Sequence, residues 1–371
     1  MLRPVLRASR PAILALAACT TPAADPATPP PTTATPASTP TPPTPLPGRI
    51  VFLADEGPNP GVAAISPDGS GRVDLVSGPG LYPSALSRDG AWLAVIAVDE
   101  PGEAHHERLR LYPLTPTGVG PVAWTSASAS HVRNPSFAPD ASFVAFEAAF
   151  DNFREIYRVD IPKYAQRRLT DNPQGNFEPA VSPDGQHIAF VSSRDMNAEL
   201  YTMTSDGAAQ TRLTHFHMDD WGPQWSPDGQ TLAFLSNREM VDRVFLMRPD
   251  GSDLRRLTAD PTPAPDPNGF LGGEPHETDP TYAADGALAF CVRKGPGASL
   301  RVAQGGKIST LTDGAASDRN PSWSPDGQHL VFTSSRDGGD LELYRITRAG
   351  HDLVRLTDHD GADWLPRWSP R

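Results

Sequence analysis

The sequence has few of the residues on which several classes of protein depend. Its two cysteines are Cys19 and Cys291, so the chain is not a disulfide-stapled scaffold. Lys and Arg together number 32 against 44 Asp and Glu, and the net charge is −12. This balance argues against nucleic-acid binding, which needs cations that replace phosphate counterions. No run approaches the roughly 18 to 20 apolar residues of a membrane-spanning helix.

Short catalytic motifs are missing as well. There is no Gly-x-Ser-x-Gly nucleophile elbow, no phosphate-binding loop and no dinucleotide fingerprint. Cys291 lies in the apolar run 287–292, where a buried structural thiol is expected rather than a nucleophile. We therefore expect a binding protein rather than an enzyme, with no cofactor and no resident metal.

Residues 1–18 have the order of an export signal. Arg3, Arg7 and Arg10 precede a short apolar segment over 12–18. The segment ends in Leu16-Ala17-Ala18-Cys19, which resembles the lipobox of bacterial lipoproteins. The resemblance implies that Cys19 becomes the first mature residue and carries acyl chains that hold the protein on a membrane leaflet. An ordinary cleaved signal peptide is the alternative; both predict an extracytoplasmic protein, periplasmic or at the outer membrane in a Gram-negative cell.

A segment rich in Pro, Thr and Ala follows over 19–47. Eleven of the chain's 42 prolines lie between Pro22 and Pro47. Such a composition cannot bury a core and is typical of extended, disordered linkers. We interpret this segment as a tether between the lipidated Cys19 and a folded domain over 48–371.

The rest of the chain is filled by a repeat of about 45 residues, in the range of propeller blades. Its clearest mark is the turn Ser-Pro-Asp-Gly, complete at 182–185, 226–229 and 324–327 and degenerate at 87–90, 138–141 and 283–286. A Pro-x-aromatic or Pro-x-aliphatic segment precedes each turn, and an alternating strand follows it. A fourth strand often ends in Arg-Leu-Thr, as at 212–214. Pro and Gly favour tight turns, so each repeat predicts four antiparallel strands.

This repeat resembles the PD40, or WD40-like, propeller repeat of the TolB family. The resemblance covers nearly all of the region from residue 48 onward. It implies an all-β propeller of four-stranded blades in which the last strand completes the first blade. Strands at 50–53 and 364–368 would then pair in one sheet, and this closure would remove exposed sheet edges.

The number of blades follows from the number of repeat starts. Six internal starts and a seventh at 366–370 predict seven blades. The TolB propeller has six, and a six-bladed ring would require the degenerate repeat from Ala85 to about Ser126 to be spurious. We prefer seven, because this repeat still contains the strand-like segments 92–96 and 108–112.

Candidate site residues lie in the connections between blades. In a four-stranded blade the Ser-Pro-Asp-Gly turns share one face of the disc, called the turn face below. The inter-blade connections share the opposite face, called the loop face, and surround the mouth of the channel. The candidate ligand-binding residues there are Glu178, His215, His217, Asp219, Trp221, His276, Asp279 and Trp364.

Three interpretations of these residues remain open. His-x-His at 215–217 with carboxylates from neighbouring blades could ligate a divalent metal, similar to the channel-mouth histidines of seven-bladed pectin-fragment lyases. Trp221 and Trp364 could instead line an acidic aromatic pocket for a peptide or sugar. All of these side chains could also be solvated loop residues. The strand tryptophans Trp225, Trp323 and Trp368 are expected to pack between blades.

The sequence favours a monomeric, membrane-anchored extracytoplasmic propeller that binds a protein or peptide of the cell envelope. The alternative is a glycan-active, lyase-like enzyme with a metal or His/carboxylate site at the channel mouth. Propellers support many chemistries, so the fold does not decide between them.

Overall fold

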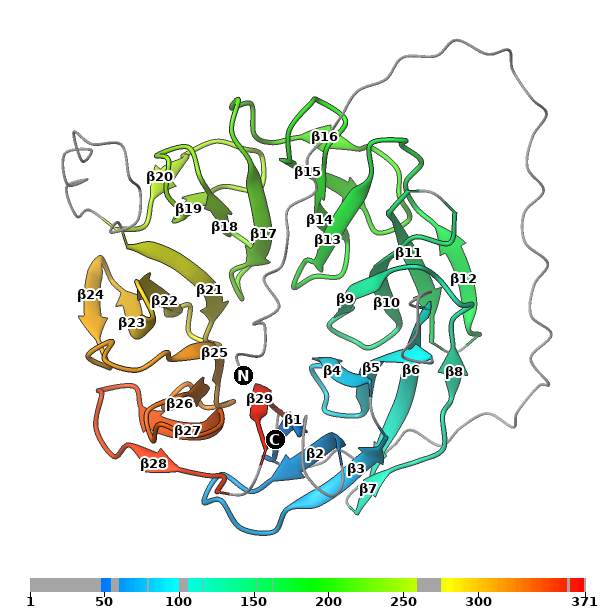
Figure 1. The fold of residues 1–371 in the computed structure, drawn as a ribbon. Helices are drawn as coiled ribbons and strands as arrows, with labels where there is room; N and C mark the ends of the chain where they lie inside the picture. The colour runs from blue at the N-terminus through cyan, green and yellow to red at the C-terminus, as the bar shows by residue number, and fades with distance from the viewer. Residues whose placement is uncertain are drawn as a thin grey trace, which may run out of the picture. The chain divides into compact units, whose positions relative to one another are not determined.

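The computed structural model describes residues 48–54, 60–78, 80–99, 106–115, 117–151, 153–161, 163–258, 275–358 and 361–369. Within these ranges the chain forms strands β1 to β29 and no helix, so no described helix could cross a bilayer. The strands make seven antiparallel sheets arranged as blades around a central channel (Figure 1). The predicted signal peptide, Cys19 and the tether lie outside the described residues.

The blades are numbered along the chain, and their strands are given from the channel outward. Blade 1 contains β29 (Asp363–Trp368), β1 (Ile50–Ala54), β2 (Gly61–Ile65) and β3 (Val73–Ser77). Blade 2 contains β4 (Leu81–Leu86), β5 (Trp92–Asp99), β6 (His106–Thr115) and β7 (Gly118–Val119), and β8 (Trp124–Thr125) also pairs with β6. Blade 3 contains β9 (Val132–Phe137), β10 (Phe143–Ala148), β11 (Glu155–Asp160) and β12 (Ala165–Arg168).

The remaining four blades repeat this order. Blade 4 contains β13 (Asn176–Val181), β14 (His187–Ser192), β15 (Glu199–Thr204) and β16 (Thr211–Arg212). Blade 5 contains β17 (Asp220–Trp225), β18 (Leu232–Ser236), β19 (Arg243–Met247) and β20 (Arg255–Arg256). Blade 6 contains β21 (His276–Tyr282), β22 (Leu288–Lys294), β23 (Gly297–Gln304) and β24 (Lys307–Thr310). Blade 7 contains β25 (Arg319–Trp323), β26 (His329–Ser334), β27 (Glu342–Thr347) and β28 (Val354–Arg355).

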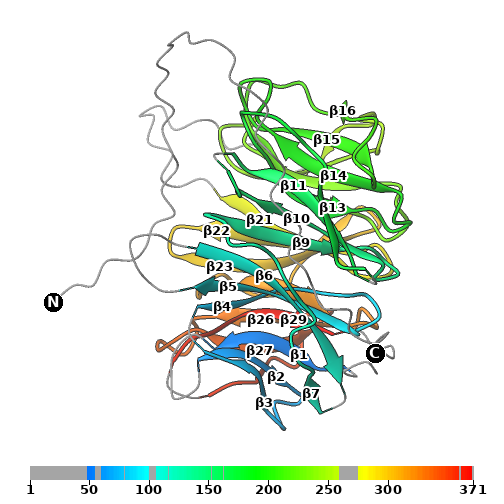
Figure 2. The same ribbon diagram turned by 90° about the vertical axis from the view of Figure 1, so that its right-hand side faces the viewer.

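The two ends of the described chain pair in blade 1. Strand β29 is antiparallel to β1, with Ile50 opposite Trp368 and Ala54 opposite Asp363. Ser369 N–H donates to Arg49 O at 2.8 Å, and Arg49 N–H donates to Ser369 Oγ at 2.9 Å. The inner strands contact one another in ring order, and β29 contacts both β25 and β4. The closed seven-bladed ring predicted from the repeat is confirmed, and the degenerate repeat is blade 2 (Figures 1 and 2).

The Ser-Pro-Asp-Gly turn is held by its own side chains. Ser182 Oγ donates to Asp184 Oδ1 at 2.5 Å, and the same carboxylate oxygen accepts from the N–H of Gln186 at 3.0 Å. These bonds hold the pKa of Asp184 below its ordinary value. Gly185 has φ 71°, a conformation in which a side chain is strained. Ser, Asp and Gly therefore each stabilise the turn, although alanine takes the serine position at 138 and 283 and the glycine position at 141.

The Arg-Leu-Thr ending has an equally specific role. In blade 4, Thr214 Oγ1 donates to the buried Glu199 carboxylate and accepts from Leu200 N–H at 2.9 Å. Arg212 Nη2 donates to the other oxygen of Glu199 at 2.9 Å. Blade 3 repeats this clamp with Glu155, Arg168 and Thr170, and blade 7 with Glu342, Arg355 and Thr357. The clamp fixes the outer strand to the third strand, which begins with the glutamate.

The core lies between blades. Six blades bury one phenylalanine completely in the second strand: Phe52, Phe146, Phe190, Phe234, Phe290 and Phe332. Val95 takes the same place after the turn of blade 2 and is also fully buried. Burial of one such side chain stabilises the fold by about 2 to 3 kcal/mol. Cys291 is a buried free thiol in β22, as the apolar run predicted, and burial raises its pKa.

Candidate functional site

The predicted histidines lie on the loop face, in the connection between β16 and β17. His215 and His217 are both exposed. Asp219 is also exposed, and its carboxylate accepts a hydrogen bond from Ala198 N–H at 3.0 Å. Among the described residues, no three His, Cys, Asp or Glu side chains are grouped so that they could hold a metal ion.

The predicted aromatic residues belong to inner strands. Trp221 is half-buried in β17 and packs in the apolar clusters on both sides of blade 5. Trp364 is half-buried in β29, opposite Leu53 of β1. Blades 6 and 7 lie between these two strands in the ring, so the two indoles come from separate parts of the propeller.

His276 and Asp279 lie in β21 of blade 6. His276 Nδ1 is 3.0 Å from Asp242 Oδ2 of blade 5, so the ring takes part in an inter-blade contact. Asp279 has φ 53° and immediately precedes Pro280. Trp225 also joins blades, as predicted, because its indole N–H donates to Ala180 O at 3.0 Å.

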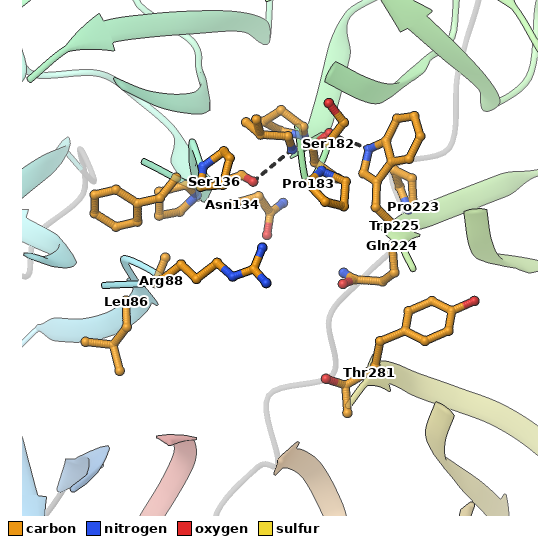
Figure 3. A pocket seen from close by; sticks show the side chains of 18 of the residues that line it. Leu86, Arg88, Asn134, Ser136, Ser182, Pro183, Pro223, Gln224, Trp225 and Thr281 are labelled. Atoms are coloured by element: carbon orange, nitrogen blue, oxygen red, sulfur yellow. Dashed lines mark hydrogen bonds between the residues drawn. The ribbon is translucent and has the colours of Figure 1, made fainter. Parts of the chain in front are cut away.

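The channel contains a cavity of about 710 Å³ at the turn face. Its wall is made of the inner strands of blades 2 to 6, the turns that follow them and Arg367 of blade 1 (Figure 3). The wall presents polar and apolar surface in similar amounts, with prolines, Trp225 and Tyr282 among its apolar residues. Of the residues proposed from the sequence, Glu178 alone lines this cavity.

A shared backbone feature shapes the inner strands. Six residues that directly precede a proline have φ between 50 and 65°: Asn134, Glu178, Gly222, Asp279, Asn320 and Leu365. The register with the second strand shifts in every blade, which indicates a bulge. Because six blades share the conformation, it belongs to the repeat rather than to one site. It matters here because Asn134, Glu178 and Gly222 reach the cavity.

Two carboxylates link three blades beside the cavity. Glu147 of blade 3 is only 1% exposed, and its Oε1 lies 2.7 Å from His131 Nε2. Its Oε2 accepts from the N–H of Glu178 in blade 4 at 2.6 Å. The Glu178 carboxylate in turn accepts from Gly222 N–H in blade 5 at 2.7 Å. This chain of hydrogen bonds sets the relative position of three inner strands at the cavity wall.

The two carboxylates ionise differently because their surroundings differ. Burial alone would raise the pKa of Glu147, but hydrogen bonds from His131 and from Glu178 N–H hold it below the ordinary value. Burial raises the pKa of Glu178 to about 7, and the negative charge of Glu147 acts in the same direction. The bond from Gly222 N–H opposes this rise but does not cancel it. Glu178 is therefore partly protonated at neutral pH.

Sequence reasoning missed the turn-face cavity because it considered only the connections on the loop face. One signal was present in the sequence. The turn of blade 2 reads Ser87-Arg88-Asp89-Gly90, with arginine where the complete copies have proline. Arg88 lines the cavity, and its guanidinium points into it (Figure 3).

Comparisons with known proteins agree with the fold. Residues 120–271 match the family model of the PD40 TolB beta propeller domain. The "Uncharacterized peptidase YuxL" of Bacillus subtilis is 33% identical over 103 residues, which are 25% of this chain and 16% of that protein. The chain spans less than a quarter of the length of the curated relatives it matches. The TolB-like PD40 repeat predicted from the sequence is thus confirmed.

Solved structures extend the likeness to most of the chain. TolB from Acinetobacter baumannii superposes with a TM-score of 0.56 at 20% identity, over 87% of this chain and 82% of that one. An oligogalacturonate lyase in complex with manganese superposes with a TM-score of 0.59 at 15% identity, over 85% of each chain. At such identities the similarity is one of fold.

Proposed function

We propose that this protein is an extracytoplasmic lipoprotein, anchored through Cys19, whose propeller binds a peptide segment of an envelope protein in the channel cavity. The observation that carries the proposal is the cavity itself. Its volume of about 710 Å³ lies within the range of roughly 300 to 1,000 Å³ typical of ligand sites. Five neighbouring blades and Arg367 contribute to one wall, so a single ligand can contact most of the ring.

The character of the wall favours a peptide. Pro135, Pro179 and Pro223 lie at equivalent positions of neighbouring inner strands, and Trp225 and Tyr282 add aromatic surface. A wall that combines rigid apolar surface with polar groups suits a peptide, which carries both apolar side chains and polar backbone groups. Ser136 Oγ already accepts from Val181 N–H at 3.0 Å, and the Trp225 indole N–H is bonded to Ala180. These two polar groups are thus already used to hold neighbouring blades together.

The cellular location rests on the N-terminal sequence. Leu16-Ala17-Ala18-Cys19 matches the lipobox at each position, and the Pro-rich segment 19–47 would place the propeller at a distance from the membrane. We do not adopt the glycan-active alternative, because the likeness to the lyase is one of fold alone.

A cavity-filling variant tests the binding proposal. Gln224 lines the cavity, whereas Thr211 is exposed on the outer strand of blade 4. We expect Gln224→Trp to abolish recovery of a formaldehyde-crosslinked envelope partner from host cells, and Thr211→Trp to leave recovery unchanged. Equal recovery with both variants would refute a channel site.

A separate variant tests the lipid anchor. We expect Cys19→Ser to stop metabolic labelling by palmitate and to release the protein from the membrane fraction.

A further inference from the structure

Two arginines of the cavity stand at positions where the other described blades have uncharged residues. At the second position of the inner turn, blade 2 has Arg88. The other described blades have Pro139, Pro183, Pro227, Ala284 and Pro325. At the middle position of the Pro-x-aromatic segment, blade 1 has Arg367. The other blades have Ala85, Ser136, Ala180, Gln224, Thr281 and Ser322. Both exceptions line the same cavity.

The blade-2 turn does not require arginine. Ser87 Oγ donates to Asp89 Oδ1 at 2.5 Å and accepts from Trp92 N–H at 2.9 Å, as in the complete copies. Gly90 N–H donates to Ser87 O at 2.9 Å. Proline at the second position would restrict the unfolded chain and favour this turn. The blade-2 turn with Arg88 therefore lacks the stabilisation that proline gives to most of the other turns. This loss indicates that the Arg88 side chain has a role outside the turn.

The Arg88 side chain is available to a ligand. No hydrogen bond or ion pair joins its guanidinium to another described residue, and the side chain is exposed. Figure 3 shows the guanidinium extending from blade 2 toward the middle of the cavity. The carboxylate nearest in sequence, Asp89, accepts hydrogen bonds from Ser87 and from Ala91 N–H within the turn.

Arg367 adds a second cation from the neighbouring blade. Its inner strand, β29, contacts the inner strand of blade 2, β4. Arg367 Nη1 donates to its own strand at Pro366 O, at 3.2 Å. Burial lowers the pKa of Arg367, while the charge of Asp279 opposes that shift. An arginine stays protonated under these conditions, so the cavity holds two cationic groups.

The third charged residue of the wall does not neutralise them. Glu178 lies across the channel in blade 4, where its carboxylate is bonded to Gly222 N–H. The wall therefore carries two arginines against one carboxylate, in a protein whose net charge is −12, and Asp279 acts on Arg367 from blade 6.

We propose that Arg88 and Arg367 bind a carboxylate group of the peptide ligand, either an acidic side chain or a free C-terminus. The proposal rests on the channel site of the proposed function and defines its ligand. Guanidinium groups bind carboxylates through paired, charge-assisted hydrogen bonds. A sugar acid could supply the same group, but the prolines of the wall, and Trp225 with its indole N–H already bonded to Ala180 O, offer its hydroxyls no hydrogen bonds.

Variants that restore the repeat test this assignment without endangering the fold. Arg88→Pro recreates Ser-Pro-Asp-Gly, and Arg367→Ser recreates Pro-Ser-Trp as in blade 7. Detergent-solubilised full-length protein is used to select binders from a random hexapeptide library with free C-termini, and from the same library with amidated C-termini. Selected peptides are then measured by titration calorimetry at low and high salt. Thermal unfolding of each variant controls for folding.

We expect the selected peptides to carry Asp, Glu or a required free C-terminus. They should bind Arg88→Pro at least tenfold more weakly, while the variant unfolds no earlier than the wild type. Affinity within twofold of the wild type in both variants would overturn the assignment. The assignment would also be overturned if the selected peptides lacked carboxylates. If such peptides competed with one another and failed to bind Gln224→Trp, the channel would still be confirmed as the binding site. Trigalacturonate is measured in the same way. If it binds with higher affinity than every selected peptide, and Arg88→Pro abolishes that binding, the arginines bind a sugar acid instead.

Discussion

The Glu147 carboxylate of blade 3 accepts a 2.6 Å hydrogen bond from the backbone N–H of Glu178 in blade 4. The residue that receives this support has φ 54° and precedes a proline, a conformation that costs free energy for a residue with a side chain. The Glu178 side chain then supports Gly222 of blade 5 in the same way. Carboxylates from one blade thus hold the bulge of the next, at the wall of the cavity.

The pH dependence of stability should report on Glu178. Its folded pKa of about 7 lies above the ordinary glutamate value, so the folded state holds a proton that the unfolded state releases. Its contribution therefore favours folding below about pH 4.5 and is lost as pH rises toward 7. We expect Glu178→Gln to raise the free energy of unfolding by about 1 to 3 kcal/mol at pH 8 relative to wild type, and by much less at pH 5. Urea unfolding at both pH values measures the difference. An equal effect at pH 5 and pH 8 would contradict the raised pKa.

Loss of the Glu147 carboxylate should be more damaging. Glu147→Ala would leave Glu178 N–H without its acceptor and would remove a partner of the His131 ring. A buried polar group that loses its partner costs about 1 to 3 kcal/mol, so we expect the free energy of unfolding to fall by roughly that amount. Asp171→Ala removes a carboxylate whose side chain is 88% exposed, and it serves as the control. A loss no larger than that of Asp171→Ala would show that the bond to Glu178 N–H is unimportant.

The Arg-Leu-Thr clamp gives a third prediction. Thr214→Ala removes the acceptor of Leu200 N–H and a donor to buried Glu199. We expect a loss of about 1 to 3 kcal/mol in the free energy of unfolding, because both partners stay buried. Thr211→Ala, on the exposed edge of the same blade, should change it by less than about 0.5 kcal/mol. The two variants are compared by urea unfolding, and similar losses would contradict a clamp.

Two methionines on the loop face should be replaceable by glycine. Met196 is 94% exposed with φ 82°, and Met240 is 61% exposed with φ 66°. The equivalent turn of blade 7 has Gly338 with φ 72°. Since glycine adopts this conformation without strain, we expect Met240→Gly to leave stability unchanged or to raise it by up to about 1 kcal/mol. A clear drop in the midpoint of thermal unfolding would show that the methionine packs against the fold.

The fold could be predicted almost completely from the sequence because its turns and strands repeat. Ser, Asp and Gly recur in most of the described inner turns, where Ser and Asp supply hydrogen bonds and Gly adopts the positive φ. Arg and Thr recur where a buried glutamate needs partners. Even the degenerate repeat of blade 2 kept enough of this pattern to be counted.

The site was less predictable from the sequence. Its position depends on which face of the propeller has a cavity between the inner strands, and no local sequence pattern specifies that. His215 and His217 are conspicuous in sequence, yet they are exposed on the loop face. Glu178 was named from its inter-blade position, but its contact with Gly222 arises from a bulge that no local pattern specifies. Arg88 was visible only as a departure from the repeat. In a repeat protein such departures are informative, because the repeated residues already meet the needs of the fold.

Site-specific photocrosslinking in host cells tests the central claim most directly. A photoreactive amino acid is placed at Gln224, in the turn-face cavity, or at His217, on the loop face. If a peptide segment of an envelope protein binds in the channel, the Gln224 variant crosslinks to a defined partner and the His217 variant does not. Crosslinks from His217 with none from Gln224 would contradict the account and place the binding surface on the opposite face of the propeller.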